Sequence, residues 1–194
     1  MRKSTIESKK NGLSLIEVMV ALAIFSASMA AASGVFVAIQ DAWRRQKTTI
    51  ELIQNGRWAM EFMTNEIRTA SSEGHPGYQK LKDKSGGKQL IFANDANGDY
   101  SEDTQMEYLL NTTTHTIERR QRAVGPNGPW SAWVVLVNHV VTPAAGAANR
   151  IFDGDKDGYV VIKLTLRPDP DPASPEGFGN SNITFSTSVI ARND

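Results

Sequence analysis

The pattern of hydrophobic and polar positions in the first third of the chain predicts one long helix. Residues 18–39 carry no charge, and this uncharged run is long enough to cross a bilayer as a helix. Beyond it the pattern becomes amphipathic without a helix breaker, since apolar side chains recur at spacings of three, four and seven. These side chains belong to Trp43, Ile50, Ile53, Met60, Met63, Ile67 and Ala70. We expect a single helix from residue 13 to about residue 71, with residues 13–39 in the membrane and this stripe of residues 40–71 against a domain core.

The remaining residues, 72–194, show the short alternating patterns that are typical of strands. In residues 104–110 the alternation places Met106, Tyr108 and Leu110 on one face, and a turn at residues 111–113 predicts a hairpin with the next strand. The expected strands cover residues 88–93, 104–110, 114–122, 130–141, 159–166 and 182–191, and an interruption near Asn138 is a further expectation for the fourth. A long helix followed by antiparallel strands indicates an α+β fold in which a β-rich domain covers the amphipathic half of the helix.

Two tryptophans, Trp130 and Trp133, lie in the longest of these expected strands. Their spacing of three residues puts them on opposite faces of a regular strand. Two interpretations stay open, because such side chains either fill a sheet core or form an exposed ledge that binds a sugar or a partner.

Composition limits the classes of function. The chain has 194 residues, enough for one domain and an anchor, and its 21 basic residues balance its 21 acidic residues. This balance gives no overall field that would attract nucleic acid, and no direct nucleic-acid partner is expected. The chain contains no cysteine, which excludes disulfides, thiol catalysis and cysteine-based zinc sites.

The sequence offers little for catalysis. The histidines, His75, His115 and His139, are isolated from one another and from any nucleophile signature. Residues 85–88 contain two glycines and a lysine but lack the spacing of a phosphate-binding loop. We therefore expect a protein that is not an enzyme.

The N-terminal segment combines a basic leader with a carboxylate in an apolar block. Basic residues before a membrane span keep their side in the cytoplasm, which places residues 72–194 in the periplasm or outside the cell. These basic residues are Arg2, Lys3, Lys9 and Lys10. The carboxylate belongs to Glu17, and an unpaired charge at the bilayer centre costs about 2.5–3.5 kcal/mol on insertion scales, so Glu17 requires a partner or a purpose.

The run Gly12-Leu13-Ser14-Leu15-Ile16-Glu17 resembles the cleavage and methylation site of type IV prepilins and type II secretion pseudopilins. The resemblance implies that an inner-membrane prepilin peptidase and methyltransferase cuts between Gly12 and Leu13, removes the leader of residues 1–12 and methylates the new amino terminus. It also implies that Glu17 takes part in assembly with other pilin or pseudopilin subunits. Leu13 departs from the phenylalanine that is usual in the family, which bears on methylation more than on cleavage.

Two other interpretations of the N-terminus are open. An ordinary secretory signal would be cut near residues 30–32, where three alanines supply the small side chains that a signal peptidase favours. Glu17 within the apolar region argues against such a signal. A plain membrane anchor would tolerate Glu17 near the interface and would give it no role.

The resemblance extends to the layout of the whole chain. Residues 54–62 are similar to the helix of PilW-type minor pilins, and residues 184–193 are similar to their closing strand. This implies a pilin-like structural subunit at or near the tip of a type IV pilus, where it helps to initiate or cap the filament. A GspJ-like minor pseudopilin of a type II secretion system has a similar plan, and a tip-displayed adhesion module is the alternative from another class.

One acidic segment matches the first half of a calcium loop. Position twelve, which should be a bidentate glutamate, is Leu164, although Asp169 or Asp171 from the following loop could replace it. The oxygen ligands would come from Asp153, Asp155, Asp157 and the Tyr159 carbonyl, with Gly158 at the turn. The alternative is a tight acidic turn between strands, so calcium is the one cofactor that the sequence suggests.

Overall fold

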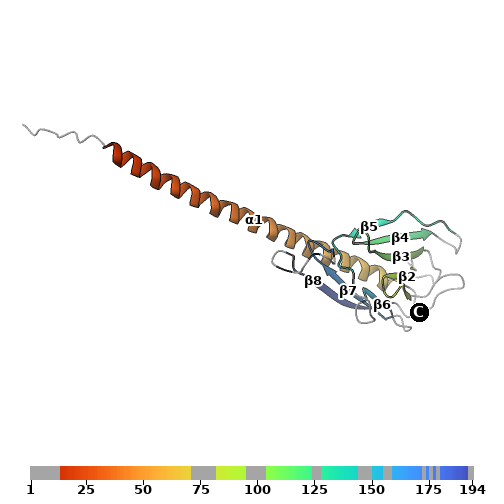
Figure 1. The fold of residues 1–194 in the computed structure, drawn as a ribbon. Coiled ribbons are helices and arrows are strands. Elements are labelled where there is room, and N and C mark those ends of the chain that lie inside the picture. The colour runs from red at the N-terminus through yellow and green to blue at the C-terminus, as the bar shows by residue number, and fades with distance from the viewer. Residues whose placement is uncertain are drawn as a thin grey trace, which may run out of the picture. The chain divides into compact units, whose positions relative to one another are not determined.

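The computed structural model describes residues 14–70, 82–94, 104–123, 128–143, 150–154, 159–171, 174, 177 and 180–191. The chain divides into two compact units, Met1–Gln46 and Lys47–Asp194. One helix, α1 (Leu15–Arg68), contributes residues to both units, and all strands belong to the second (Figure 1).

Helix α1 confirms the predicted long helix and lies within its predicted limits. The stretch contains no proline, and its residue types are mostly good helix formers. At its C-terminal end the Thr69 and Ala70 amides donate to the Glu66 and Ile67 carbonyls at 3.3 and 3.0 Å, so the last turn tightens to an i→i−3 pattern. The predicted end at residue 71 falls just outside the described residues.

The first sheet has five antiparallel strands in the order β1-β2-β3-β4-β5. The strands are β1 (Lys82–Lys84), β2 (Gln89–Asn94), β3 (Thr104–Asn111), β4 (Thr116–Ala123) and β5 (Val134–Val137). The β3–β4 pair is the predicted hairpin, with Leu110 opposite Ile117. At its turn the Asn111 side-chain oxygen accepts hydrogen bonds from the amides of Thr113 and Thr114 at 3.1 and 3.2 Å, and these bonds stabilise the reversal of the chain.

The second sheet has three antiparallel strands in the order β6-β7-β8, namely β6 (Phe152–Gly154), β7 (Tyr159–Leu166) and β8 (Ile183–Ile190). The Phe152 amide donates to the Gly87 carbonyl at 2.9 Å, which joins β6 to the β1–β2 turn. Gly87 has φ of +80°, and an added Cβ would overlap Arg150, so this junction requires glycine. The α+β class is confirmed.

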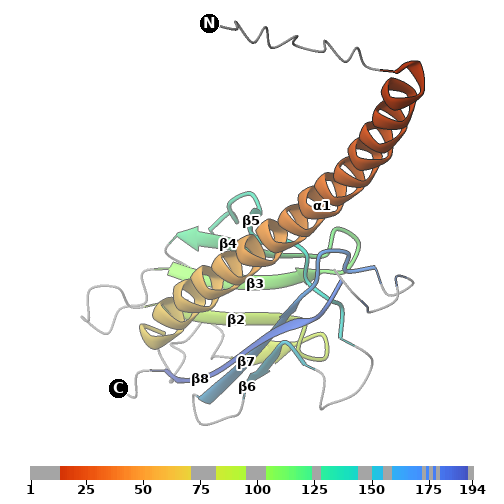
Figure 2. The ribbon, with the colours of Figure 1, turned by 90° about the vertical axis from the view of Figure 1, so that its left-hand side faces the viewer.

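The core lies between the second half of α1 and the sheets (Figure 2). Tyr108 is fully buried at its centre, with its ring centroid 5.9 Å from Phe92 and 6.2 Å from Phe152. Met106, Tyr108 and Leu110 belong to one buried cluster, as the alternation predicted. Tyr108 of the five-stranded sheet thus meets Phe152 of β6, so a single core serves both sheets.

The predicted stripe on the helix is only half right. Met60, Met63, Ile67 and Ala70 are buried as expected, whereas Trp43 is 72% exposed and Ile50 is also exposed. Ile50 and Ala59 are nine residues apart, which is 2.5 helical turns, so they point to opposite sides. Trp43 and Ile50, which are seven residues apart, therefore both lie on the exposed side of α1.

Gly56 lies on the buried face of α1 and marks a close approach. An added Cβ there would overlap the Phe185 ring of β8 and would lie 3.0 Å from Leu166 of β7. The absent side chain allows β7 and β8 to approach the helix backbone. Gly56 therefore has a packing role in the second unit.

The strand predicted for residues 130–141 is much shorter than expected, because only Val134–Val137 form β5. His139, two residues beyond β5, has φ of +62°, which a strand does not accommodate. Before β5, Trp130 makes only an isolated bridge to Arg122. The three-residue strands β1 and β6 were not predicted.

Candidate assembly site

The helical segment that follows the predicted cleavage motif is exposed along residues 14–47, and we call it the bare helix. Every residue from 14 to 47 is exposed, including the large apolar side chains of Leu15, Ile16, Leu22, Phe25 and Phe36. A helix that is apolar on all sides is not stable in water and needs lipid or other helices around it. Of the described helices, α1 is the one long and apolar enough to cross a membrane.

The serines within the uncharged run of residues 18–39 hydrogen-bond to the backbone of their own helix. The hydroxyls of Ser26, Ser28 and Ser33 each donate to the carbonyl four residues earlier at 2.8 Å. This back-bonding removes unpaired donors from a surface that water does not reach in a membrane. These serines therefore leave the segment compatible with an apolar environment.

Glu17 caps the first turn of its own helix. The Ser14 amide donates to Glu17 Oε2 at 2.8 Å, while the amides of Glu17 and Val18 donate to the Ser14 carbonyl at 3.0 and 3.2 Å. This is the glutamate half of a capping box, and a carboxylate at a helix N-terminus also interacts favourably with the helix dipole. The spacing Ser14-x-x-Glu17 carried this signal, but the sequence reasoning missed it.

The cap lies close in sequence to the predicted cleavage site between Gly12 and Leu13. Gly12 and Leu13 lie outside the described residues, but Ser14, whose amide Glu17 holds, is the residue directly after Leu13. Ile16, Val20, Ala21 and Ile24 form an apolar strip next to the Glu17 carboxylate. The arrangement complements an apolar helix that carries one positive charge at its end.

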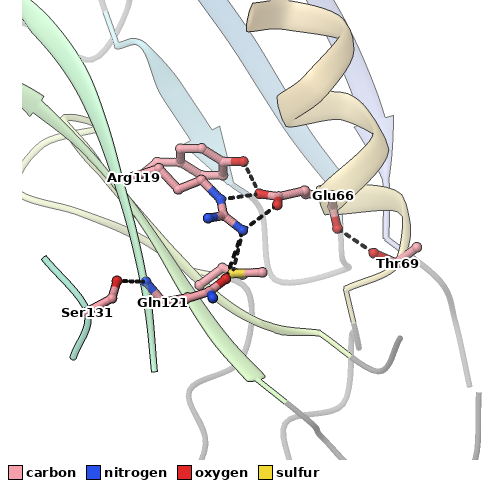
Figure 3. A network of polar contacts seen from close by, with 7 residues as sticks. Glu66, Thr69, Arg119, Gln121 and Ser131 are labelled. Carbon is pink, nitrogen blue, oxygen red and sulfur yellow. Dashed lines mark hydrogen bonds and ion pairs between the residues drawn. The ribbon is translucent and has the colours of Figure 1, made fainter. Parts of the chain in front are cut away.

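A second carboxylate on α1, Glu66, binds the sheet (Figure 3). Glu66 accepts from Arg119 of β4 through both oxygens, Oε1 from Nη2 at 2.6 Å and Oε2 from Nε at 3.0 Å. The Tyr108 hydroxyl of β3 also donates to Oε2. Burial raises the pKa of Tyr108, and the hydrogen bond to Glu66 raises the pKa of Arg119, so the tyrosine stays neutral and the arginine stays charged.

These three residues form what we call the Glu66 clasp, which fixes the last turns of α1 to the middle of the five-stranded sheet. Arg119 also packs 5.6 Å from the centroid of Phe62, one turn earlier on the helix. Glu66 and Arg119 are 53 residues apart, so no local pattern could pair them. The sequence held one local clue to this contact, because the charged Glu66 lies next to Ile67, an apolar residue of the predicted stripe.

Trp130 and Trp133 do not lie on opposite faces, because the segment that carries them is not a regular strand. Both rings are half-buried and enclose Arg120, with the guanidinium carbon 4.4 and 4.3 Å from their centroids. The buried Glu107 accepts from Arg120 Nε at 2.5 Å and also from the Gln89 amide. The two tryptophans therefore hold their segment onto β4 through cation–π contacts.

The structure describes only part of the suggested calcium loop. Asp153 is exposed in β6 and lies 3.4 Å from Arg150, while Tyr159 begins β7; Asp155, Asp157 and Gly158 fall outside the described residues. Gly154 pairs with Val160, so the loop joins two antiparallel strands rather than two helices. No group of three acidic or histidine side chains suited to a metal occurs among the described residues, and calcium stays a prediction.

The suggestion that Asp169 or Asp171 completes the loop is wrong. Asp153 pairs with Val161 near the start of β7, whereas both aspartates follow its end at Leu166. Val161 and Leu166 are five positions apart along the strand, which is roughly 17 Å. Asp169 instead accepts from the Ser174 hydroxyl at 2.5 Å.

Comparison with known proteins identifies the N-terminal segment. A family model described as the prokaryotic N-terminal methylation motif matches residues 8–33. No curated protein and no solved structure matches the chain. The matched residues include the leader end, Gly12, Leu13, Glu17 and the first part of the bare helix. The chain therefore carries a prokaryotic N-terminal methylation motif, which supports the resemblance to type IV prepilins and pseudopilins.

Proposed function

We propose that the protein is a structural subunit of a type IV pilus, assembled through the first half of α1 after cleavage between Gly12 and Leu13. The observation that carries the proposal is the bare apolar helix directly behind the methylation motif, next to a second unit with its own core. Such a helix has two environments available to it. Before assembly it lies in the inner membrane, and after assembly it lies among the helices of other subunits.

The basic leader supports a single-pass orientation. Its lysines and arginine keep residues 1–12 in the cytoplasm, and the β-rich unit then lies in the periplasm. Prepilin peptidase meets the cleavage site at the cytoplasmic membrane surface, where the leader ends. Cleavage frees a positively charged amino group on Leu13, next to the residue that Glu17 holds.

Glu17 is proposed to change partners during assembly. In the isolated chain its carboxylate accepts from its own Ser14 amide at 2.8 Å. In a bundle of helices, the Leu13 amino terminus of a neighbouring subunit brings a full positive charge, which a backbone amide lacks, and the attraction between two opposite charges is strong where water is excluded. Pairing removes most of the cost of burying either charge alone, and it sets the axial register between subunits.

The finer role we propose is that of a minor subunit that initiates or caps the filament. The large strand-rich unit, the lack of cysteine and the similarity of residues 54–62 and 184–193 to PilW-type minor pilins support it. The methylation motif is shared with pseudopilins, so a GspJ-like subunit of a type II secretion system is the second candidate. Loss of piliation against loss of protein secretion in a deletion strain distinguishes the two.

Intact mass and N-terminal sequencing of the full chain, expressed with and without a prepilin peptidase, test the proposal. We expect a mature chain that starts at Leu13 and carries one added methyl group, and only when the peptidase is present. Gly12→Val is the matched control, because a β-branched side chain at the cut site should leave the chain uncut. A start near Ser33 would indicate an ordinary signal peptide, and an uncut wild-type chain in both samples would indicate a plain anchor.

A further inference from the structure

The uncharged run of residues 18–39 is followed by residue types that are typical of a membrane–water boundary. About one turn after Ile39, α1 carries Trp43, Arg44 and Arg45 in succession. We call these three residues the collar. Trp43 is 72% exposed, and both arginines are exposed as well. The collar therefore offers one large aromatic ring and two guanidinium groups at the end of the apolar run.

The collar residues point in different directions around the helix axis. Consecutive residues of an α-helix are about 100° apart, so three in succession spread over about 200° of the circumference. A protein that docks on a helix covers one face, and residues three or four positions apart share such a face. A lipid surface instead surrounds a helix that crosses it. The spread of the collar thus favours a membrane surface over a protein partner.

The position of the collar along α1 agrees with the dimensions of a bilayer. Residues 18–39 have a rise of about 33 Å at 1.5 Å per residue, and the hydrocarbon core is about 30 Å thick. The polar layers extend the bilayer to about 40–45 Å, which adds roughly 5–7 Å on each side. Trp43 lies four residues beyond Ile39, or about 6 Å, which is the depth of the headgroups.

We propose that the collar binds the headgroups of anionic phospholipids, in the leaflet through which the chain leaves the membrane toward its second unit. This contact fixes the depth at which α1 crosses the bilayer. The inference rests on the membrane stage of the proposed function, in which the bare helix lies in the inner membrane before assembly.

The chemistry of the collar matches an anionic lipid surface. A guanidinium group can donate two parallel hydrogen bonds to phosphate oxygens, and it stays charged at physiological pH. Tryptophan is enriched at bilayer boundaries because its ring is apolar and its N–H is a hydrogen-bond donor. Residues 40–45 contain two arginines against one aspartate, Asp41, so this part of α1 is positively charged overall. Such a charge attracts anionic lipids.

A collar at one headgroup layer also determines where Glu17 lies. Glu17 and Trp43 are 26 positions apart, which is about 39 Å of helix and close to the full thickness of the bilayer with its headgroups. Glu17 then comes to the opposite boundary, where water and headgroups solvate its carboxylate, and not to the bilayer centre. The collar thereby holds the predicted cleavage site, which precedes Glu17, at the membrane surface.

The depth of the collar can be measured on the uncleaved full chain. The chain has no native cysteine, so Ala42→Cys or Ala38→Cys carries a single bimane probe. The vesicles contain equimolar phosphatidylglycerol and phosphatidylcholine, with a spin label on the headgroup or deep in the acyl chain of a tracer lipid. We expect the headgroup label to quench the probe at residue 42 more strongly, and the acyl-chain label to quench the probe at residue 38 more strongly.

Replacing the collar should remove the headgroup preference of the probe at residue 42. The variant combines Trp43→Ala, Arg44→Gln and Arg45→Gln, whose new residues are good helix formers, so α1 should persist. The charge is tested separately by native mass spectrometry of the chain released from the same membranes, which gives the ratio of retained phosphatidylglycerol to phosphatidylcholine. Arg44→Gln with Arg45→Gln should lower this ratio about fivefold for each arginine removed.

The matched control removes the same charge from exposed positions farther along α1. Arg57→Gln with Arg68→Gln should leave both the lipid ratio and the quenching profile unchanged. An equal fall in the lipid ratio for this control, or no fall for the collar variant, would overturn the proposal. So would a quenching profile that the collar variant leaves unchanged. Quenching of the probe at residue 42 by aqueous iodide, and by neither lipid label, would place the collar outside the membrane and leave it to a protein partner.

The outcomes separate this proposal from the proposed function. A chain that is processed at Leu13 but carries its residue 42 probe in water loses the lipid contact and keeps the pilin function. A chain whose probe lies among the headgroups but that no prepilin peptidase cuts loses the pilin function and keeps the lipid contact.

Discussion

The Glu66 clasp gives the sharpest test of how the helix is held on the sheets. We expect Arg119→Met to leave the Glu66 carboxylate buried with only the Tyr108 hydroxyl as a partner. The side chains of Arg119 and Glu66 are 19% and 16% exposed, so both charges are largely removed from water. Breaking a buried pair by removing one partner costs about 3–5 kcal/mol, and the residual exposure points to the lower end, about 3 kcal/mol.

This free energy converts into a measurable change in melting temperature. For domains of 150–250 residues, 1 kcal/mol shifts the melting temperature by about 2–4 °C, so Arg119→Met should lower it by roughly 6–12 °C. The assay is thermal unfolding of the full chain in a mild detergent at pH 7, followed by tryptophan fluorescence. Trp58 stacks on Phe62, which Arg119 touches, so the signal reports on this region.

Three further variants separate the clasp from general damage, namely Glu66→Gln, its combination with Arg119→Met, and Lys47→Met. Glu66→Gln combined with Arg119→Met should be less destabilised than the sum of the single changes, because the double variant buries no unpaired charge. Lys47→Met breaks the exposed Lys47–Glu51 pair on the same helix, which spans 3.8 Å, and should cost less than about 0.5 kcal/mol. A loss below about 3 °C for Arg119→Met, or additivity in the double variant, would refute the reasoning.

Three other predictions concern separate features. Gly56→Ala should destabilise the second unit by about 1–3 kcal/mol, because the new methyl group overlaps the Phe185 ring. Gly34→Ala, with no atom within 4 Å and with the better helix propensity of alanine, should cause no loss of stability; thermal unfolding of both variants checks this. Glu17→Gln should leave cleavage intact but reduce incorporation into filaments, measured as the ratio of sheared to membrane-bound subunit, and equal ratios would remove its assembly role. Hydrogen bonds from the Ser174 hydroxyl and the Asp171 amide hold the pKa of Asp169 below its ordinary value, so its stabilising contribution is present above about pH 4 and is lost as the pH falls further. The difference in melting temperature between wild type and Asp169→Asn should therefore shrink between pH 7 and pH 3, and a constant difference would contradict this.

The sequence was sufficient where structure is set by local periodicity. The long helix, the β3–β4 hairpin with its Asn111 turn, and strands β7 and β8 were predicted close to their observed limits, since each depends on residues that are near one another in the chain. The cleavage motif was also readable, because a glycine, a basic leader and Glu17 stand at fixed spacings before an uncharged run.

What the sequence could not show depends on contacts between distant segments. Arg119 and Glu66 become partners only after β4 folds against α1, and Gly56 gains its role only when β8 lies against the helix. The error over Trp43 and Ile50 has the same origin, because an apolar residue at the right spacing does not reveal which face of the helix the sheet covers. Strands β1 and β6 have three residues each and carry no periodic signal.

The two halves of α1 differ in whether their apolar side chains are buried and their carboxylates are paired with a cation. This difference argues for which half takes part in assembly. In the second half, Leu52, Ala59, Met63 and Ile67 are buried, and Glu66 is neutralised by Arg119. In the first half no apolar side chain is buried, and the carboxylate of Glu17 has only a backbone amide of its own helix among the described residues. A helix whose second half is already packed in a domain and whose first half is exposed can associate through the first half without unfolding the domain. On the proposed function, the first half supplies the driving force for entry into a bundle, while the clasp keeps the domain attached to the helix that enters it.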